Sequence, residues 1–243
     1  MSRPGALEIL DHCETPIGLL CLRRRELLSR PGTMVTEVTL DNEFLMSSYN
    51  TISEGALASL AVKLHGGSEL RCLVGGLGLG YTAAAALESG KVADLEVVEL
   101  LPEVIGWLER GLIPLAGQLR GDSRMRLVKG DIYGNLASPP GDLWDLILID
   151  VDHNPGERLD QGSKTFYSAE GLRKTRDWLA PGGVLAVWSS REDEVFLENL
   201  RQVFPDARCE TVAWWNELID QEQEDAIFVA TCTPNYEAPL RTD

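Results

Sequence analysis

One segment, residues 71–99, constrains the fold more than any other part of the chain. A short apolar run, Cys72–Val74, is followed by the glycine-rich sequence GGLGLG at residues 75–80 and then by an Ala-rich stretch from Thr82 to Leu87. This order predicts a β-strand, a tight turn and an α-helix. A second apolar run, Leu95–Val98, ends at Glu99. The segment therefore predicts a βαβ unit with an acidic residue at the end of its second strand.

The residue types in this unit suit a particular kind of ligand. Glycine lets the backbone approach a nucleotide-like molecule closely, and a carboxylate at a strand end can accept hydrogen bonds from both ribose hydroxyls. Glu99 follows Gly80 by roughly twenty residues, which is the spacing of a ribose-binding acid in such units. The segment favours a site for an adenosine-type ligand, and an ordinary tight turn between a strand and a helix is the alternative.

Composition limits the class of protein. Of the 243 residues, 44% are hydrophobic and 25% are charged, as in a globular protein with a full core. No apolar run approaches the ~20 residues of a membrane span, and the N-terminus lacks the apolar centre of a signal peptide, so we expect a cytoplasmic protein. The formal net charge of −16 disfavours nucleic acid and favours cationic small molecules. The five cysteines are scattered without a CxxC pair, and we expect no metal site.

The chain is expected to fold in two parts. Residues 1–52 contain two β-rich runs, Leu19–Leu22 and Val35–Leu40, and a turn at Asp41-Asn42, which together favour a small antiparallel hairpin unit. Ser53 is the expected N-cap of a helix that spans Glu54–Leu64. From there to residue 243, apolar runs alternate with helical segments, which predicts a Rossmann-like catalytic domain built on a doubly wound, mostly parallel sheet.

The predicted sheet has seven strands. The last two, Arg208–Trp214 and Ala226–Thr231, have no helix between them, which indicates an antiparallel ending. The other strands are expected at residues 72–74, 95–98, 125–128, 144–149 and 184–188, and the helices between them at 82–87, 102–118, 169–179 and 192–204.

Four consecutive predicted strands end in glycine or in acidic residues. They are the strand before the glycine-rich turn and the strands that end at Glu99, Asp131 and Asp150. In an open α/β sheet, ligands bind at the carboxyl ends of the strands, where these residues would meet. Each acid taken singly has an alternative role as a turn residue or helix N-cap. Their coincidence at successive strand ends favours a binding site.

With these motifs in place, the chain resembles the spermidine synthase family, within the class I S-adenosylmethionine-dependent methyltransferase fold. The motifs lie in family order: LVGGLGLG from residue 73, VVEL from 97, KGDIY from 129, DLILIDVDHNP from 145 and TFYSAEGLRKTRDWLAPGGVLAVW from 165. The resemblance implies that S-adenosylmethionine or its decarboxylated form is the donor. It implies a donor site that wraps the methionine-derived part, holds the ribose and addresses the adenine: Gly75, Gly76, Leu77, Gly78, Gly80, Glu99, Leu100, Asp131, Ile132 and Asp150.

Some positions depart from the family pattern. In polyamine-making members of the family the glycine turn has a sequence like GGGDGG. The Asp of that motif pairs with the aminopropyl ammonium, and Gly78 stands in its place in this chain. Leu45 stands in place of their Gln, and residues 150–155 replace their DSSDP segment but keep its first acid and its Pro. The missing acid favours methyl transfer from intact S-adenosylmethionine, whereas the overall resemblance favours aminopropyl transfer.

Asp150 is the main candidate for catalysis. An amine that attacks a sulfonium carbon loses a proton, and a carboxylate held beside the donor can accept it. A turn cap or a purely structural carboxylate is the alternative. Asp152 and His153 are the next candidates, because they could hold or deprotonate the acceptor, unless they form only a hydrophilic loop.

Three aromatic or amide residues are candidates for the acceptor pocket. Tyr167 follows the loop that starts at Asp150, and Trp215 and Asn216 lie at the mouth of the predicted closing hairpin. The alternatives are an aromatic residue of the core for Tyr167 and packing at a strand end for the other two. The run Arg23–Arg25 is expected to be a solvated strand end or turn.

The predicted function is therefore alkylation of a small nucleophile, most simply an amine, by an S-adenosylmethionine-type donor with Asp150 as the base. Polyamine aminopropyl transfer, the activity of spermidine synthase, is one alternative. A non-catalytic module that has kept the nucleoside pocket is the other, because one fold hosts many functions. The expected partners are small molecules, with no nucleic acid and no membrane, and a homodimer is an open possibility.

Overall fold

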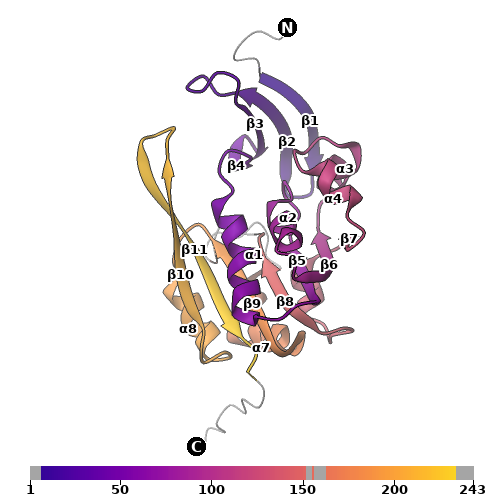
Figure 1. Ribbon diagram of the computed structural model, residues 1–243, viewed down its shortest axis with the longest axis vertical. Coiled ribbons are helices and arrows are strands. Elements are labelled where there is room, and N and C mark those ends of the chain that lie inside the picture. Colours follow the sequence, from indigo (N-terminus) through magenta and orange to yellow (C-terminus); the bar gives the residue numbers. More distant parts are fainter. Residues whose placement is uncertain (1–6, 152–154, 156–162, 234–243) are drawn as a thin grey trace, which may run out of the picture.

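The chain forms two β-sheets in the computed structural model, which describes residues 7–151, 155 and 163–233 (Figure 1). The first sheet is antiparallel, and its strands follow one another in the order of the sequence. Its strands are β1 (Leu7–Thr15), β2 (Gly18–Glu26), β3 (Met34–Leu40) and β4 (Glu43–Ser47). The turn predicted at Asp41-Asn42 is confirmed, since both residues have positive φ, at 50° and 69°.

The second sheet has seven strands in the order β10-β11-β9-β8-β5-β6-β7. They are β5 (Leu70–Gly75), β6 (Val92–Glu99), β7 (Met125–Lys129), β8 (Trp144–Ile149), β9 (Leu179–Ser189), β10 (Arg208–Asn216) and β11 (Gln221–Thr231). The strands β5 to β9 are mutually parallel, and β11 pairs antiparallel with both β9 and β10. The predicted fold class and the antiparallel ending are confirmed. Because the strand order reverses at β5, a crevice is expected between the carboxyl ends of β5 and β8.

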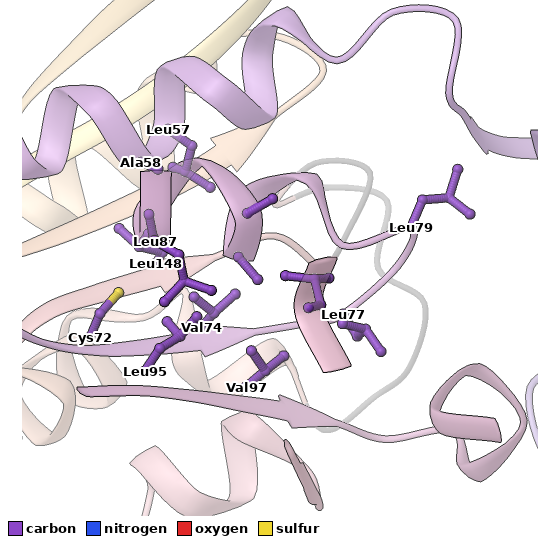
Figure 2. Close-up of a cluster of buried hydrophobic side chains, with 14 of the residues drawn as sticks. Leu57, Ala58, Cys72, Val74, Leu77, Leu79, Leu87, Leu95, Val97 and Leu148 are labelled. Carbon is purple, nitrogen blue, oxygen red and sulfur yellow. The ribbon is translucent and has the colours of Figure 1, made fainter. Parts of the chain in front are cut away.

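Helices cover both faces of this sheet. One hydrophobic cluster joins the sheet to α1 (Ile52–His65), α2 (Tyr81–Glu88), α3 (Pro102–Arg110) and α4 (Ala116–Gly121). The other joins it to α5 (Ile132–Leu136), α6 (Ser163–Phe166), α7 (Ala169–Asp177) and α8 (Glu194–Arg201). Figure 2 shows part of the first cluster, in which Leu57 of α1 and Leu87 of α2 lie over Val74 and Leu148. A fully buried Leu such as Leu57 contributes about 1.5–3 kcal/mol.

The four-stranded sheet packs onto the same core. Its residues Leu20, Leu22 and Val38 belong to the first hydrophobic cluster. At its edge, the indole N–H of Trp107 in α3 donates a hydrogen bond of 2.7 Å to Asp11 of β1. Helix α1 begins at Ile52, beside the division expected between residues 52 and 53. Whether the two parts are separate domains stays a prediction.

Two predicted helices differ from the observed ones. Ser53 was expected to cap α1, but it lies inside the helix, and the N-cap is Thr51, whose side chain makes no capping hydrogen bond. The segment expected to form one helix over 102–118 forms α3 and α4. Gly111 adopts a left-handed conformation with φ 74° and ends α3, and Gly111 followed by Pro114 is a helix-stop signal that the prediction did not use.

The observed strand boundaries differ from the predicted ones where packing, and not local sequence, decides them. The segment Pro181-Gly182-Gly183 was expected to separate a helix from a strand, but it lies within β9, where its backbone exchanges hydrogen bonds of 2.7 Å with Cys232. Strand β11 begins at Gln221 instead of Ala226, because β10 and β11 form a two-stranded ribbon that needs no apolar face. Strand β1 was not predicted, since it is an edge strand whose Leu7 and Ile9 are exposed.

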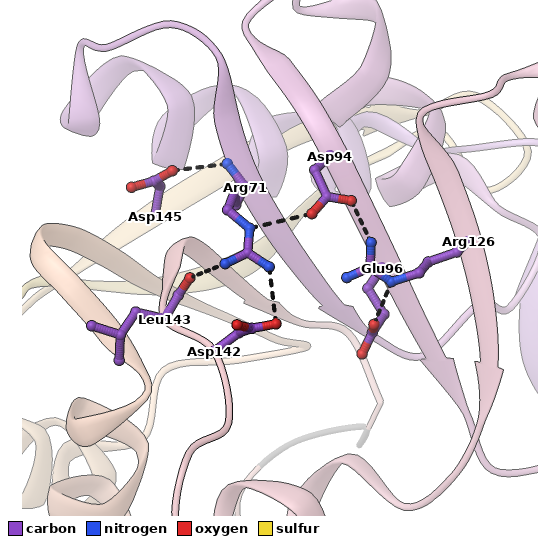
Figure 3. A network of polar contacts seen from close by, with 7 residues as sticks. All are labelled: Arg71, Asp94, Glu96, Arg126, Asp142, Leu143 and Asp145. Atoms are coloured by element: carbon purple, nitrogen blue, oxygen red, sulfur yellow. Dashed lines mark hydrogen bonds and ion pairs between the residues drawn. The ribbon is translucent and has the colours of Figure 1, made fainter.

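A polar network closes the amino ends of the central strands (Figure 3). Arg71 of β5 pairs with Asp94 of β6, and Arg126 of β7 pairs with Asp94 and Glu96 at 2.5 and 2.6 Å. Trp144 lies under both guanidinium groups, with its ring centroid 4.8 Å from Cζ of Arg71 and 5.6 Å from Cζ of Arg126. The network links β5, β6, β7 and β8 at their amino ends, which lie opposite the crevice. In the described part of the chain, no helix is long and apolar enough to cross a membrane.

Candidate active site

Two adjoining cavities lie where the carboxyl ends of the parallel strands meet the four-stranded sheet. The smaller, of about 100 Å³, lies against the glycine-rich turn, and we call it the turn cavity. The larger, of about 640 Å³, extends towards α1 and the hairpin of β10 and β11, and we call it the acidic groove. Both are lined by Met46, Gly78 and Asp150. A donor in the turn cavity would therefore meet an acceptor in the groove beside Asp150.

Most of the predicted donor-site residues line the turn cavity. They are Gly76, Gly78, Glu99, Leu100, Asp131, Ile132 and Asp150. Leu77 lines the acidic groove instead. Gly75 and Gly80 line neither cavity: a Cβ at Gly75 would lie 2.8 Å from Cγ1 of Ile132, and one at Gly80 would collide with Leu119. These two glycines therefore permit packing of the chain on itself.

Gly76 is constrained by the protein's own backbone. Its φ of 91° is in the left-handed region, and an added Cβ would collide with the carbonyl oxygen of Asp150. The sequence predicted a close approach of this glycine to a ligand. The structure adds a close approach of β5 to the end of β8, which brings the glycine turn and Asp150 together.

Glu99 holds the glycine turn in place. Its two carboxylate oxygens accept hydrogen bonds of 2.8 Å from the backbone N–H groups of Leu77 and Leu101, and the residue is 8% exposed. Burial raises the pKa of Glu99, and the backbone N–H groups around it partly offset this effect. The backbone N–H groups of Gly78 and Leu100 also act on this carboxylate, so its contact with ribose hydroxyls stays a prediction.

Asp131 has a structural role as well as a place in the turn cavity. It is the N-cap of α5, where its Oδ1 accepts a hydrogen bond of 2.9 Å from the backbone N–H of Tyr133. This is the capping role considered as the alternative from sequence. The side chain of Ile132 is buried beside it.

Asp150 follows β8 and is fixed by α2. Its Oδ2 accepts a hydrogen bond of 2.6 Å from the hydroxyl of Thr82, in the first turn of that helix. Burial raises the pKa of Asp150, Thr82 lowers it and the nearby charge of Asp225 raises it. A carboxylate with a raised pKa is suited to accept a proton. Thr82 was missed from sequence, because nothing local links it to a residue so distant along the chain.

Glu54 lies in the same groove as Asp150 and was also missed. Burial, followed by the charge of Asp150, raises the pKa of Glu54 to about 7. A signal was present in the sequence: Glu54 shares a helix face with Leu57, Ala58 and Ala61, three residues of α1 that are fully buried. A glutamate on an apolar helix face is expected to be buried, which is unusual for a charged side chain.

The predicted acceptor residues are placed differently from one another. Asn216 lines the acidic groove together with Trp214, which lies two residues earlier on the same face of β10, while Trp215 lies on the other face and is 57% exposed. Tyr167 is 4% exposed and lies in an aromatic cluster, where its hydroxyl is 3.1 Å from that of Tyr133. Tyr167 lines neither cavity. Asp152 and His153 lie outside the described residues.

The sequence suggested that the run Arg23–Arg25 is a solvated strand end or turn, and the structure contradicts this. Arg23 and Arg25 project to the same side of β2 and line the acidic groove. Both pair with Glu37 of β3, at 2.9 Å for Arg23 and 2.7 Å for Arg25, and Glu37 is 3% exposed. Within the described ranges, no group of three or more His, Cys, Asp or Glu residues is arranged to hold a metal ion.

Known proteins resemble the chain in sequence and in fold. Polyamine aminopropyltransferase 2 of Streptomyces coelicolor (strain ATCC BAA-471 / A3(2) / M145) is 32% identical over 130 residues, which are 53% of this chain and 23% of that protein. The match thus spans about a quarter of that relative's length. No protein-family model matches the chain.

Solved structures show the same fold. Spermidine synthase from Thermotoga maritima and a spermidine synthase in complex with the transition-state analogue AdoDATO both superpose with a TM-score of 0.72 at 16% identity, covering 94% of this chain and 73% of theirs. A probable spermidine synthase from Corynebacterium glutamicum ATCC 13032 superposes with a TM-score of 0.65 at 16% identity, covering 95% and 83%. The resemblance to the spermidine synthase (polyamine aminopropyltransferase) family, on the class I S-adenosylmethionine-dependent methyltransferase fold, is therefore confirmed.

Proposed function

We propose that the protein is an aminopropyltransferase, which moves the aminopropyl group of decarboxylated S-adenosylmethionine to a small amine. The observation that carries the proposal is the acidic groove beside the turn cavity. Its lining includes four carboxylates, which come from α1, the end of β8 and β11: Glu54, Asp150, Glu224 and Asp225. Carboxylates at the rim of a partly buried groove stabilise an ammonium, which an amine acceptor carries at neutral pH.

The lining of the turn cavity suits the nucleoside of the donor, although a cavity of about 100 Å³ would have to widen or open into the adjoining groove to hold it. It combines the glycine turn with Glu99 and Asp131, whose carboxylates lie at the ends of neighbouring strands. Backbone amides, a buried carboxylate and an apolar wall are the groups that recognise an adenosine. This part of the proposal does not depend on which group of the donor is transferred.

Asp150 is proposed as the base. Asp150 accepts a proton from the acceptor's ammonium, which frees the lone pair of the amine. The amine then attacks the aminopropyl methylene carbon bonded to the sulfonium, so a C–N bond forms while the C–S bond breaks and its electron pair stays on sulfur. The products are methylthioadenosine, which is a neutral thioether, and a secondary ammonium that keeps its remaining protons. Thr82 orients the carboxylate, and the two cavities hold the reactants beside it, so positioning is expected to supply much of the rate.

Methyl transfer is the second candidate, and the glycine turn favours it. A Cβ at Gly78 would lie 2.9 Å from Sδ of Met46, so the thioether of Met46 stands close to where an acidic side chain would begin. Without an acid there, nothing in the glycine turn selects the ammonium of the decarboxylated donor against the carboxylate of the intact one. The sequence similarity to a polyamine aminopropyltransferase favours aminopropyl transfer more strongly.

One experiment separates the candidates. The protein is incubated with 1,4-diaminobutane, or with an amino acid that carries a second amine, and with each donor in turn, and the products are identified by mass spectrometry. Release of methylthioadenosine with an aminopropylated amine supports the proposal, whereas a methylated amine supports the second candidate. Binding of methylthioadenosine without any product would indicate a non-catalytic nucleoside-binding module. Asp150→Asn is the control, expected to bind methylthioadenosine and to lose activity by about 10²–10⁴-fold.

A further inference from the structure

The acidic groove has a cationic wall. Arg23 and Arg25 line it from β2 of the four-stranded sheet. The carboxylates of the groove come from other elements, namely α1, the end of β8, and β11. Arg24, between them, is absent from the lining, because successive residues of a strand point to opposite faces. The lining thus carries charges of both signs on separate elements.

The two arginines are not neutralised by their partner. Both guanidinium groups share the single carboxylate of Glu37: Nε of Arg23 donates to Oε2 at 2.9 Å, and Nε of Arg25 donates to Oε1 at 2.8 Å. The triad therefore keeps a net charge of about +1. Among the residues that the structure describes, neither guanidinium has another hydrogen-bond or ion-pair partner.

The spare donors are accessible. The side chains of Arg23 and Arg25 are 33% and 36% exposed, whereas that of Glu37 is 5% exposed. A guanidinium has five N–H groups in a planar fork that matches the two oxygens of a carboxylate. The buried Glu37 holds the two forks side by side, so they are pre-organised for an anionic oxygen pair.

A simple diamine fits this groove poorly. One ammonium would lie near Glu54 and Asp150, but a second ammonium that reached the wall of β2 would meet the excess positive charge of the triad. A molecule with an amine at one end and a carboxylate at the other satisfies both walls. The groove, with a volume of about 640 Å³, has room for a molecule of this size.

We propose that Arg23 and Arg25 bind a carboxylate carried by the acceptor, and that this carboxylate offsets the charge of the ammonium on the adjacent carbon, so that the acceptor is a diamino acid of the ornithine or lysine type. The reacting amine is the one near Asp150, and the carboxylate lies against β2. This inference rests on the proposed function, and it changes the acceptor from a diamine to its carboxylated counterpart.

The test compares two acceptors that differ only in the carboxylate, ornithine and 1,4-diaminobutane, with decarboxylated S-adenosylmethionine as the donor. The wild-type protein is expected to prefer ornithine by at least tenfold in kcat/KM. Arg23→Gln and Arg25→Gln are each expected to lower this ratio at least tenfold. Glu37→Gln keeps one acceptor oxygen to hold the arginines and removes the competing negative charge, so it is expected to raise the ratio. Arg24→Gln, on the other face of β2, is the matched control and is expected to leave the ratio unchanged.

A second readout does not need turnover. Equilibrium dialysis of ornithine, in the presence of methylthioadenosine, is expected to show the same order of affinities among variants whose folding has been checked by thermal unfolding. A purely structural role of the arginines would lower stability in all three groove variants without moving the ratio in opposite directions.

The remaining outcomes are distinct. Equal use of both acceptors by the wild type and by the arginine variants would overturn the inference and leave the proposed aminopropyl transfer intact. If the arginine variants change the choice between intact and decarboxylated donor, and not the choice of acceptor, the carboxylate belongs to the donor and the inference is wrong. Failure to bind methylthioadenosine and to modify any amine would overturn both the proposed function and the inference.

Discussion

The hydroxyl of Thr82 donates a hydrogen bond of 2.6 Å to Oδ2 of Asp150, so the first turn of α2 holds the carboxylate that follows β8. The same helix begins directly after the glycine turn, which forms one side of both cavities. A single element thus connects the expected donor site with the proposed base.

Replacing Thr82 by Val, which has the same shape but no donor, is expected to raise the pKa of Asp150. Burial already raises that pKa and the Thr82 hydrogen bond lowers it, so its loss leaves the acid protonated to higher pH. The rising limb of the pH–rate profile should move to higher pH, and activity at pH 7 should fall about tenfold, as for the loss of one hydrogen bond to a charged group. Thr82→Ser keeps the donor and should restore the profile. An unshifted profile in Thr82→Val would exclude Asp150 as the titrating base.

Glu54 makes stability depend on pH. Burial beside Asp150 raises its pKa from 4.5 to about 7, so between these pH values the folded chain binds more protons than the unfolded chain. The free energy of unfolding therefore falls as the pH rises through this interval. Glu54→Gln is expected to be more stable than wild type by about 3 kcal/mol at pH 8 and by little at pH 4.5, in urea unfolding. Glu43→Gln, at an exposed position, should show no such difference. Equal destabilisation by Glu54→Gln at both pH values would contradict the buried, repelled carboxylate.

Glu99→Gln is expected to weaken nucleoside binding. The glutamine amide has one acceptor oxygen, so its NH₂ group must face an N–H of Leu77 or Leu101, which both donate to Glu99 at present. Loss of a charge-assisted hydrogen bond costs about 1.5–3 kcal/mol, which corresponds to roughly 10- to 100-fold in the calorimetric Kd of methylthioadenosine. Glu96→Gln, on the same strand but in the network at the opposite edge, is the control. Unchanged affinity in a folded Glu99→Gln protein would move the nucleoside away from this strand end.

Gly78→Asp tests the choice of donor. A carboxylate at residue 78 would attract the aminopropyl ammonium and repel the carboxylate of intact S-adenosylmethionine, so relative affinity should shift at least tenfold towards the decarboxylated donor. The φ of 50° is in the region that Asp tolerates better than most residues, but the new Cβ would approach Met46 at 2.9 Å. The substitution is therefore made in a Met46→Ala background, with Met46→Ala alone as the reference. If both proteins show the same donor preference, Gly78 does not face the transferred group.

Much of the parallel sheet could be predicted from sequence. The bounds of β8 coincide with the predicted run 144–149, because a buried central strand is apolar along its whole length and ends sharply at Asp150. The meeting of the glycine turn, Glu99, Asp131 and Asp150 at one cavity also followed from strand order alone. Where strands lie in a solvated ribbon, as in β10 and β11, the apolar signal is lost and the boundaries were set too short.

The rest of the candidate site depends on contacts between distant segments. Thr82 and Asp150 are 68 residues apart, and Arg23 reaches Glu37 only because β2 and β3 pair in that register. Gly76 illustrates the same limit. The sequence suggested that this glycine lies against a ligand, but the Asp150 carbonyl beside it means that a side chain at residue 76 would disturb the chain's own packing first.

The residues proposed to select the acceptor and those proposed to bind the donor come largely from different parts of the chain. Arg23, Arg25, Glu37, Met46 and Glu54 all come from the first quarter of the chain, while the glycine turn, Glu99, Asp131 and Asp150 come from the middle. Under the proposed function, acceptor choice is expected to respond to substitutions at the groove-lining residues of the first part of the chain, while Glu99 and Asp131 keep their places in the turn cavity. Libraries confined to the groove-lining positions Arg23, Arg25 and Glu54 would test new acceptors without replacing Leu20, Leu22 and Val38, which belong to the core.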